Sequence, residues 1–271
     1  MVYMKSRLMV YKAILWLHIT RLERYKYGFL NMILIDVMWY LIFLLGALMF
    51  VPSNEYLTIA VITFWGIVLW VIMNNSVWLI AGWTWFALAS GLVEEHFLYN
   101  VNPLIFIAGR FLTGISVTLA TIPVVLTIFS SIAGSYIFYV YSPVYLGLGM
   151  ILMLIYSTLY SLILVALSLR TSVPGVMLDV FNIFMYVGGG IGVPVARMPE
   201  ALRYFALAMP YTHAAEILRY GVLGLKPYYG LENELIIASI YIIVLATITY
   251  IVIKIVMKYV RRHGVRAIGI M

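Results

Sequence analysis

The chain has 271 residues, of which 65% are hydrophobic and 10% are charged, and its mean hydropathy is +1.06. A chain with this small share of polar groups cannot cover the surface of a soluble globule of this size. The composition therefore indicates an integral membrane protein. The sequence contains no cysteine, which excludes disulfides, zinc–thiolate sites and thiol nucleophiles.

Six stretches have the length and apolarity of a transmembrane helix, which needs about 20 mostly apolar residues. They cover residues 31–50, 57–81, 104–128, 144–169, 175–195 and 235–257. Little chain remains outside them for a separate soluble domain. We therefore expect an all-α integral membrane fold with six transmembrane helices, organised as a single transmembrane domain over residues 1–271.

The formal net charge of +7 could indicate nucleic-acid binding, but the positions of the cations indicate membrane topology instead. Most of the 17 Lys and Arg residues lie before residue 31, after residue 253, or at Arg110 and Arg170. With an even number of spans, the positive-inside rule then places both termini in the cytoplasm of a multi-pass protein. The rule leaves four cations outside: Arg197, Arg203, Arg219 and Lys226.

Residues 1–30 predict an amphipathic helix. The basic residues Lys5 and Lys12 lie off its apolar stripe, as does Glu23. This pattern favours a helix in the cytoplasmic membrane interface, with its apolar face toward lipid and its basic residues toward anionic headgroups. The alternative is a cytoplasmic helix that packs on the protein itself. The stripe has helical spacing and consists of Leu8, Tyr11, Leu15, His18, Leu22, Tyr25 and Phe29.

The second predicted span carries three adjacent polar residues, Asn74, Asn75 and Ser76. Unpaired amides are costly in lipid, so these side chains should face protein or water. They are candidates for lining a transport pathway. Hydrogen bonding between helices in a dimer interface is the alternative explanation.

Residues 90–103 form the longest internal segment on the predicted cytoplasmic side, with room for about two to three helical turns. Gly91 precedes a compact polar tip made of Glu94, Glu95 and His96. A partner protein could recognise this tip electrostatically, whereas a merely solvated loop would have the same composition.

Three ionisable residues lie inside the predicted spans: Asp36, Arg110 and Asp179. Each is about four to six residues from the cytoplasmic end of its span, so all three are expected at one depth. Pairing lowers the cost of charge in lipid, which suggests that Arg110 bridges the two aspartates. Alternatively, each side chain extends separately toward the headgroups.

Residues 187–224 cannot form an ordinary span, because prolines and charged residues interrupt them. Irregular backbone exposed to lipid is too costly, so this stretch must leave the bilayer or fold back into it under cover of protein. We expect an extracellular or re-entrant segment over residues 197–230, before the last span. Pro199 and Pro210 precede its helices, and Glu216 and Arg219 can pair on one helix face. As a surface pair they would contribute little to stability.

Two of these stretches resemble the ABC-2 type permeases, the membrane-spanning subunits of a class of ABC exporters. Gly91, Leu92, Val93 and Glu94, with Pro103 nine residues later, resemble the Gly-Thr-Leu-Glu and Pro of the family's coupling helix. Leu92 and Val93 depart from that pattern. The break at Pro210, followed by Glu216 and Arg219, is similar to the family's region before the last span.

The resemblance implies an exporter permease in the plasma membrane that forms its pathway with a second permease subunit, as a homodimer or a heterodimer. It implies a separate ABC ATP-binding subunit that holds ATP and Mg and docks on the amphipathic helix and the coupling segment, Gly91, Glu94, Glu95 and His96. Pro199, Pro210, Glu216 and Arg219 would then shape an extracellular gate. Nothing in the sequence selects a substrate.

Enzymatic functions fit the sequence poorly, and we predict no catalytic residue and no cofactor bound by this chain. It has no phosphate-binding loop for ATP hydrolysis. Its four histidines are far apart and lack metal-site spacing, so no metal site is predicted. Two other classes remain open: an ion- or proton-coupled carrier that uses Asp36, Arg110 and Asp179, and a membrane scaffold without transport.

Overall fold

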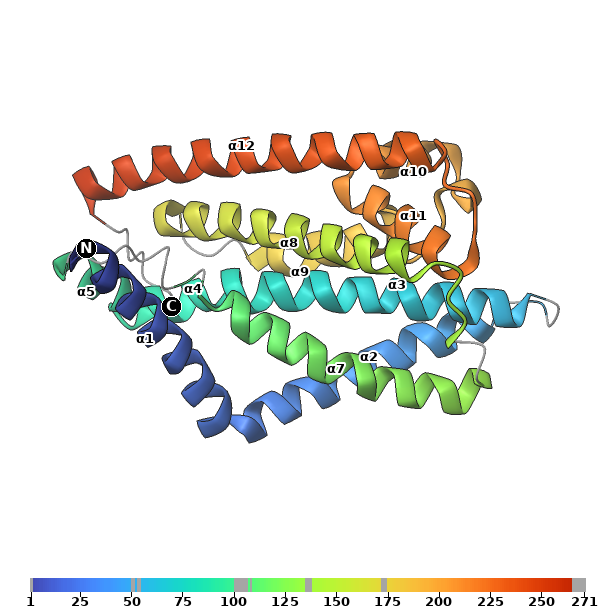
Figure 1. Ribbon diagram of the computed structural model, residues 1–271, viewed down its shortest axis with the longest axis horizontal. Coiled ribbons are helices and arrows are strands. Elements are labelled where there is room, and N and C mark those ends of the chain that lie inside the picture. Colours follow the sequence, from blue (N-terminus) through green and yellow to red (C-terminus); the bar gives the residue numbers. More distant parts are fainter. Residues whose placement is uncertain are drawn as a thin grey trace.

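The structure is a computed structural model that describes residues 2–49, 52, 55–99, 107, 109–134, 138–171 and 175–264. Those residues form helices and connecting segments, without a strand, and most of the helices lie side by side along the long axis of the molecule (Figure 1). In chain order the elements are α1 (Val2–Arg24), α2 (Lys26–Met49), α3 (Tyr56–Ser76), the π-helix η1 (Val77–Gly82), α4 (Trp83–Ala89), α5 (Leu92–Leu98), α7 (Phe111–Ala133), α8 (Pro143–Thr171), α9 (Gly175–Gly188), the 3₁₀-helix η3 (Val195–Arg197), α10 (Glu200–Leu207), α11 (Pro210–Leu223) and α12 (Leu231–His263).

Within the described ranges, four helical stretches are long and apolar enough to cross a membrane: Tyr56–Ala89, Phe111–Ser131, Pro143–Arg170 and Leu231–His263. They coincide with the predicted spans 57–81, 104–128, 144–169 and 235–257, although residues 104–106 lie outside the described residues. Helix α2 runs through the predicted first span, 31–50, as far as Met49.

The predicted fifth span, 175–195, does not form one long helix. Helix α9 ends at Gly188 after 14 residues, about 21 Å at the helical rise, which is short of a hydrocarbon core of about 30 Å. The cause is the glycine run that follows: Gly190 has φ of +78°, a left-handed conformation that continues no helix. In a hydropathy profile, glycines count as apolar and extend the predicted span, but in the structure the glycine run ends the helix.

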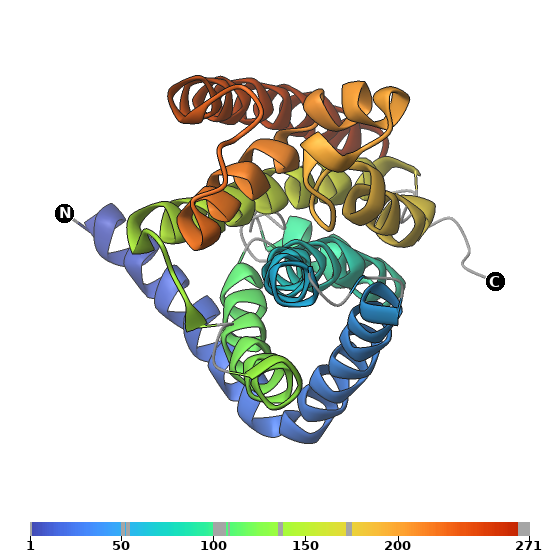
Figure 2. The same cartoon turned by 90° about the vertical axis from the view of Figure 1, so that its right-hand side faces the viewer.

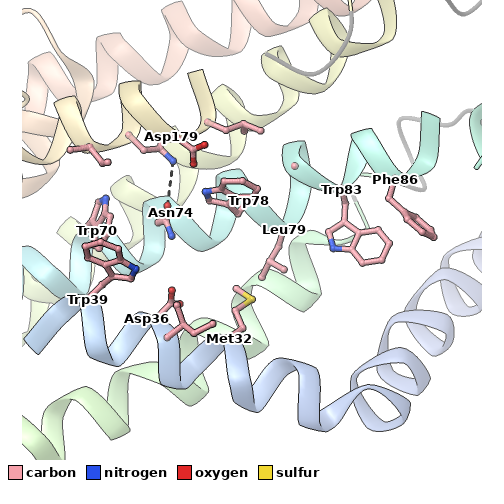
Figure 3. Close-up of a pocket in the computed structure, with 15 residues that line it drawn as sticks. Met32, Asp36, Trp39, Trp70, Asn74, Trp78, Leu79, Trp83, Phe86 and Asp179 are labelled. Atoms are coloured by element: carbon pink, nitrogen blue, oxygen red, sulfur yellow. Dashed lines mark hydrogen bonds between the residues drawn. The ribbon is translucent and has the colours of Figure 1, made fainter. Parts of the chain in front are cut away.

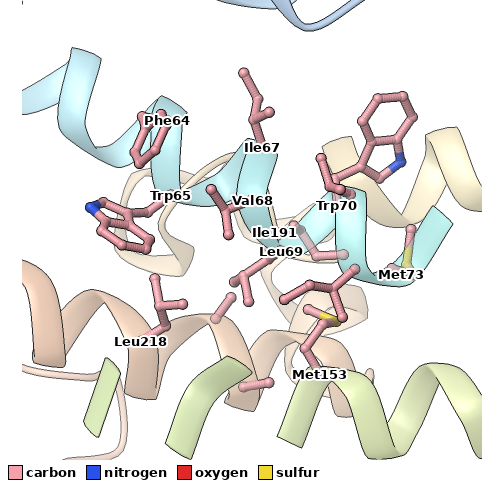
Figure 4. Packing of buried hydrophobic residues seen from close by; sticks show 14 of the residues in the cluster. Phe64, Trp65, Ile67, Val68, Leu69, Trp70, Met73, Met153, Ile191 and Leu218 are labelled. Carbon is pink, nitrogen blue, oxygen red and sulfur yellow. The ribbon is translucent and has the colours of Figure 1, made fainter. Parts of the chain in front are cut away.

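Helix α3 is the central helix of the bundle, with α2, α7, α8 and α9 around it (Figure 2). Its residues 60–73 are all buried. Figure 4 shows Phe64, Ile67 and Leu69 among side chains that include Met153 of α8 and Leu218 of α11. A helix that is apolar on every side can be covered by protein or by lipid, and in this bundle protein covers α3.

Helix α12 lies at the edge and packs on α8 and α11. Its outer face exposes large apolar side chains such as Ile236, Ile240 and Ile243. Continuous apolar faces of this kind suit a lipid environment better than water.

The two ends of the bundle differ in charge. Helix α5, the start of α1 and the end of α12 lie at one end, which we call the α5 end, whereas α10 and α11 lie at the other, the α11 end (Figure 1). Basic residues gather at the α5 end, for example Arg170 at the end of α8 and Arg261 and Arg262 at the end of α12.

A helix forms in the predicted region, but α1 ends at Arg24, and residues 26–30 belong to α2. The predicted apolar stripe does not all face outward: His18 is buried, and its Nδ1 lies 3.4 Å from Oγ1 of Thr113 on α7. Tyr25 of the stripe is exposed, as are Trp16 and Ile19, which lie off it. The side chains of Leu8, Tyr11 and Leu15 lie outside the described residues. At His18, therefore, α1 packs on the protein.

Candidate functional site

A cavity of about 740 Å³ opens between three walls: α2, the continuous stretch α3–η1–α4, and α9 (Figure 3). Its volume is within the range of sites that hold drug-sized molecules. It is lined by Met32, Ile35, Asp36, Trp39, Trp70, Asn74, Trp78, Leu79, Gly82, Trp83, Phe86, Leu178, Asp179, Asn182 and Ile183.

Two carboxylates enter this cavity from opposite walls, Asp36 from α2 and Asp179 from α9 (Figure 3). Between them, Nδ2 of Asn182 donates a hydrogen bond of 3.4 Å to Oδ1 of Asn74. The carboxylate of Asp36 interacts with the Tyr40 hydroxyl. Oδ1 of Asn182 is shielded from solvent and has no hydrogen-bond partner within the described part of the chain. The polar centre of the cavity therefore has an unused acceptor.

Aromatic rings form much of the remaining wall: Trp39, Trp70, Trp78, Trp83 and Phe86. Trp70 is held from behind, because Tyr40 makes an edge contact with its ring at 5.4 Å and Tyr186 a tilted contact at 5.5 Å. Such aromatic contacts fix ring orientation as well as adding stability. The cavity wall is therefore preorganised rather than loosely packed.

The π-helix η1 shapes the wall between Asn74 and Trp83. Trp78, Leu79 and Gly82 of this segment line the cavity. A Cβ atom on Gly82 would lie 2.8 Å from Cε3 of Trp78, so only glycine leaves room for that indole. Short π segments inside α-helices occur often at functional sites.

Arg110 does not bridge Asp36 and Asp179 in this structure. The ion pairs among the described residues are Arg197–Glu55, His213–Glu234 and Arg219–Glu216. The guanidinium of Arg110 instead stacks on Trp83, with 3.5 Å from Cζ to the ring centroid. Arg21 of α1 lies over the same ring at 4.8 Å.

The local position of Arg110 differs from the prediction: α7 begins at Phe111, so Arg110 is the residue before that helix rather than one turn inside it. Arg110 is 2% exposed, and its Nε and Nη2 atoms have no hydrogen-bond partner among the described residues. It lines a second, much smaller cavity with Arg21. The structure thus brings the two aspartates together and places the arginine elsewhere.

Of the three polar residues in the second span, only Asn74 reaches the cavity. Nδ2 of Asn75 donates to Oγ1 of Thr118 on α7 at 3.2 Å, and Oγ of Ser76 donates to the carbonyl of Ile72 at 2.7 Å. Successive helical residues are separated by about 100°, so three neighbours cannot share one face. Asn75 and Ser76 serve packing within this chain.

The predicted coupling segment contains the two-turn helix α5, and residues 100–103 lie outside the described residues. Gly91 has φ of +71°, which separates α4 from α5. Glu95 is exposed, Glu94 is half-buried, and Nδ1 of His96 contacts the carbonyl of Leu92. The acidic tip is therefore partly accessible, whereas His96 is engaged with its own helix.

At the α11 end, Glu216 and Arg219 pair as the spacing predicts, but they are buried rather than on the surface. Nη1 of Arg219 donates to Oε1 of Glu216 at 2.8 Å, and the two side chains are 5% and 8% exposed. Nη2 of Arg219 donates to the carbonyls of Gly190 and Ile191 at 2.5 and 2.6 Å. The pair thus fastens α11 to the glycine-rich loop after α9.

This burial changes what the pair contributes. Burial lowers the pKa of Arg219 from its ordinary value, and the carboxylate of Glu216 raises it again. The carboxylate therefore offsets part of the cost of burying the cation. Pro199 precedes α10, and Pro210 is the first residue of α11, where a missing N–H costs nothing.

The pattern of the sequence did not reveal a second buried pair. Nδ1 of His213 lies 2.5 Å from Oε2 of Glu234, and the two side chains are 1% and 0% exposed. Nε2 of His213 lies 3.2 Å from the carbonyl oxygen of Leu207. The pair links α11 to the first turn of α12. The one signal for this pair in the sequence was Glu234, an acidic residue in the first turn of the apolar helix α12.

No group of three or more His, Asp or Glu side chains in the described ranges is arranged to hold a metal ion. The sequence matches no protein-family model, and none of the curated proteins compared with it is significantly similar to it.

Proposed function

We propose that this chain is the permease subunit of an ATP-driven ABC-2 type exporter, which forms its translocation pathway as a dimer. A separate ATP-binding subunit supplies the energy and holds ATP and Mg. The observation that carries the proposal is the large cavity between α2, α3–η1–α4 and α9, with polar groups at its centre and aromatic rings around them. Polar groups at such a position are expensive unless they serve a ligand or a pathway.

The cavity is half of a pathway in this proposal. Its walls α2 and α9 come from distant parts of the chain and are not joined across the opening by another helix of the described bundle (Figure 2). A second permease subunit placed against them would close the opening. The two subunits together would then enclose a route between the membrane faces.

Helix α5 is the proposed docking point for the ATP-binding subunit, with Glu94 and Glu95 facing it and His96 holding the helix turn. The stretch Tyr56–Ala89 is one continuous helical rod that ends next to α5. A rigid rod transmits a displacement along its length. Movement of α5 would therefore reach Trp83, Trp78 and Asn74 in the cavity wall.

The short helices α10 and α11 are the proposed re-entrant segment and extracellular gate, with Pro199 and Pro210 at their starts. Residues 189–191 of the loop after α9 are buried, which keeps that irregular backbone away from lipid, whereas the connection before α12 includes the exposed residues Leu225, Lys226, Tyr228 and Tyr229. The buried Glu216–Arg219 pair keeps α11 fixed to the loop after α9.

The charge distribution supports a plasma-membrane topology with both termini in the cytoplasm. Basic residues gather at the α5 end, as the positive-inside rule requires of a cytoplasmic face. The α11 end then faces outward.

The test is co-purification of the chain with a candidate ABC ATP-binding subunit, followed by ATPase measurements in lipid. We expect a stable complex whose ATPase activity loses its coupling to transport in the double variant Glu94→Ala, Glu95→Ala. Glu232→Ala, an exposed acid in the first turn of α12, is the matched control and should leave coupling unchanged. Failure to form a complex with any ABC ATP-binding subunit would refute the proposal.

A second candidate function is an ion- or proton-coupled carrier, because Asp36 and Asp179 share one cavity. Arg110 would not belong to its relay, since that residue lies beyond Trp83 in the smaller cavity. Uptake driven by an ion gradient into vesicles that contain only this chain would favour the carrier over the ATP-driven permease.

A further inference from the structure

We infer that the cavity between α2, α3–η1–α4 and α9 binds an amphipathic organic cation, a molecule with one delocalised or shielded positive charge on an apolar, aromatic body. This inference deepens the proposed function, on which its transport role rests, by naming the class of molecule the pathway accepts. Binding itself requires only the cavity.

The charges of the lining residues give the sign of the ligand. Two carboxylates line the cavity, and among the described residues no Lys, Arg or His does so. Arg21 and Arg110 line the separate smaller cavity, where both lie over the ring of Trp83. An acidic site without a cationic partner is costly in a membrane, and a bound cation removes that cost.

The carboxylates are placed to share one ligand. Asp36 and Asp179 approach from opposite walls, and the Asn74–Asn182 hydrogen bond joins α3 to α9, the wall that carries Asp179 (Figure 3). The carboxylate of Asp36 interacts with the Tyr40 hydroxyl, whereas Oδ1 of Asn182 is buried and accepts no hydrogen bond within the described residues. The two carboxylates and this amide oxygen give the centre of the site a negative potential.

The rest of the wall gives the body of the ligand. Trp39 and Trp78 present indole rings, the residue type that interacts most strongly with cations through its π face. Met32, Ile35, Leu79 and Ile183 add apolar surface. A small hydrated ion such as Na⁺ would leave a cavity of about 740 Å³ mostly empty, whereas an aromatic cation of drug size would fill it.

The same arrangement argues against two other occupants. A neutral acyl chain gains nothing from two carboxylates and two carboxamides, and it would leave them without partners. A second copy of this chain that filled the cavity would have to insert cationic side chains into it, whereas a copy that only closes the opening leaves the site free for a ligand.

The probe is tetraphenylphosphonium, compared with tetraphenylborate, which has nearly the same size and shape but the opposite charge. Binding to the purified full-length chain in lipid nanodiscs is measured by tryptophan fluorescence, because several tryptophans line the site. We expect saturable binding of the cation and at least about tenfold weaker binding of the anion, a ratio that reports charge selectivity alone.

The double variant Asp36→Asn, Asp179→Asn should weaken tetraphenylphosphonium binding about tenfold or more and leave tetraphenylborate binding unchanged or stronger. Retained binding of the anion shows that the variant is folded. Glu200→Gln, an exposed acid on α10, is the matched control and should behave as the unchanged chain does.

Equal binding of both ions, or a double variant that binds the cation as before, would overturn the inference and identify the cavity as a general lipid-facing groove. Absence of binding by either ion would also overturn it. Disulfide formation between copies that carry Ile183→Cys would then show whether a second copy fills the groove. Cation binding by a chain that forms no complex with any ABC ATP-binding subunit would leave this inference standing while the exporter proposal fails.

Discussion

At the scale of single residues, side-chain pairs that depend on spacing along a helix could be predicted from the sequence, whereas the burial of those side chains could not. Glu216 and Arg219 pair because they are three residues apart on a helix. Their charge suggests a surface position, and only the fold shows that the loop after α9 covers them. Asp36 and Asp179 share a cavity as expected, whereas the place of Arg110 depends on where α7 begins.

The buried Arg219 should be far more important for stability than an exposed arginine at the same end. Arg219→Met leaves the Glu216 carboxylate and two carbonyls without their donor, so it should lower the free energy of unfolding by about 3–5 kcal/mol. Arg197→Met removes a pair in which both side chains are nearly half exposed and should cost about 0–1 kcal/mol.

Thermal unfolding of the two variants in detergent, followed by circular dichroism, measures this difference. Adding Glu216→Leu to Arg219→Met should recover part of the loss, because the uncompensated carboxylate is then gone. Equal midpoints for Arg219→Met and Arg197→Met would show that the clamp around Gly190 and Ile191 contributes nothing.

At the scale of elements, the apolar pattern predicted where helices occur better than where they end. Four of the predicted spans are long helices in the structure. The fifth predicted span ends early. Gly188, Gly189 and Gly190 count as apolar in a hydropathy profile, but helix α9 ends at this glycine run. The sequence does not predict the π-helix η1. The change from i→i+4 to i→i+5 hydrogen bonds extends over only six residues, too few to alter the apolar pattern detectably.

The pairing of α8 with α11 depends on glycines at the contact. A Cβ atom on Gly221 would lie 2.3 Å from the backbone N of Leu146, and one on Gly149 would lie 2.6 Å from Cβ of Leu218. Neither backbone can yield cheaply, so Gly221→Ala and Gly149→Ala should each destabilise the chain by about 1–3 kcal/mol.

Gly147 provides the control for that experiment. It lies in the same helix α8, and a Cβ atom there would meet nothing within 4 Å. Gly147→Ala should therefore stabilise by about 0.5–1 kcal/mol through helix propensity. Unfolding midpoints of the three alanine variants should fall on opposite sides of that of the unchanged chain, and a common shift in one direction would contradict close packing at α8–α11.

At the scale of the whole molecule, composition predicted the class of fold, and charge predicted which ends lie together. The basic ends of α8 and α12 do share one end of the bundle with the start of α1, whereas the basic last turn of α1 lies at its junction with α2. The sequence could not show that α3 is the centre and α12 the edge, because both contain a long apolar stretch. That difference lies in which partners cover them.

The absence of cysteine makes the topology directly testable, because any introduced cysteine is the only reactive thiol. Lys226→Cys, before α12, should react with a membrane-impermeant maleimide added to intact cells. Glu95→Cys in α5 and Arg262→Cys at the end of α12 should react only after the membrane is opened. Labelling of all three in intact cells, or the reverse order, would contradict the proposed orientation.

The contrast between α3 and α12 has a consequence for how the protein can evolve. In the most apolar stretch of α12 only 11% is buried, whereas 78% is buried in the corresponding stretch of Tyr56–Ala89. Lipid accepts any apolar side chain, so outward positions of α12 are free to drift among Leu, Ile, Val and Phe. Positions such as Gly66 are not, since a Cβ there would lie 2.9 Å from the carbonyl oxygen of Ile191. Among homologues of this protein, the sequence of α3 should therefore change more slowly than that of α12.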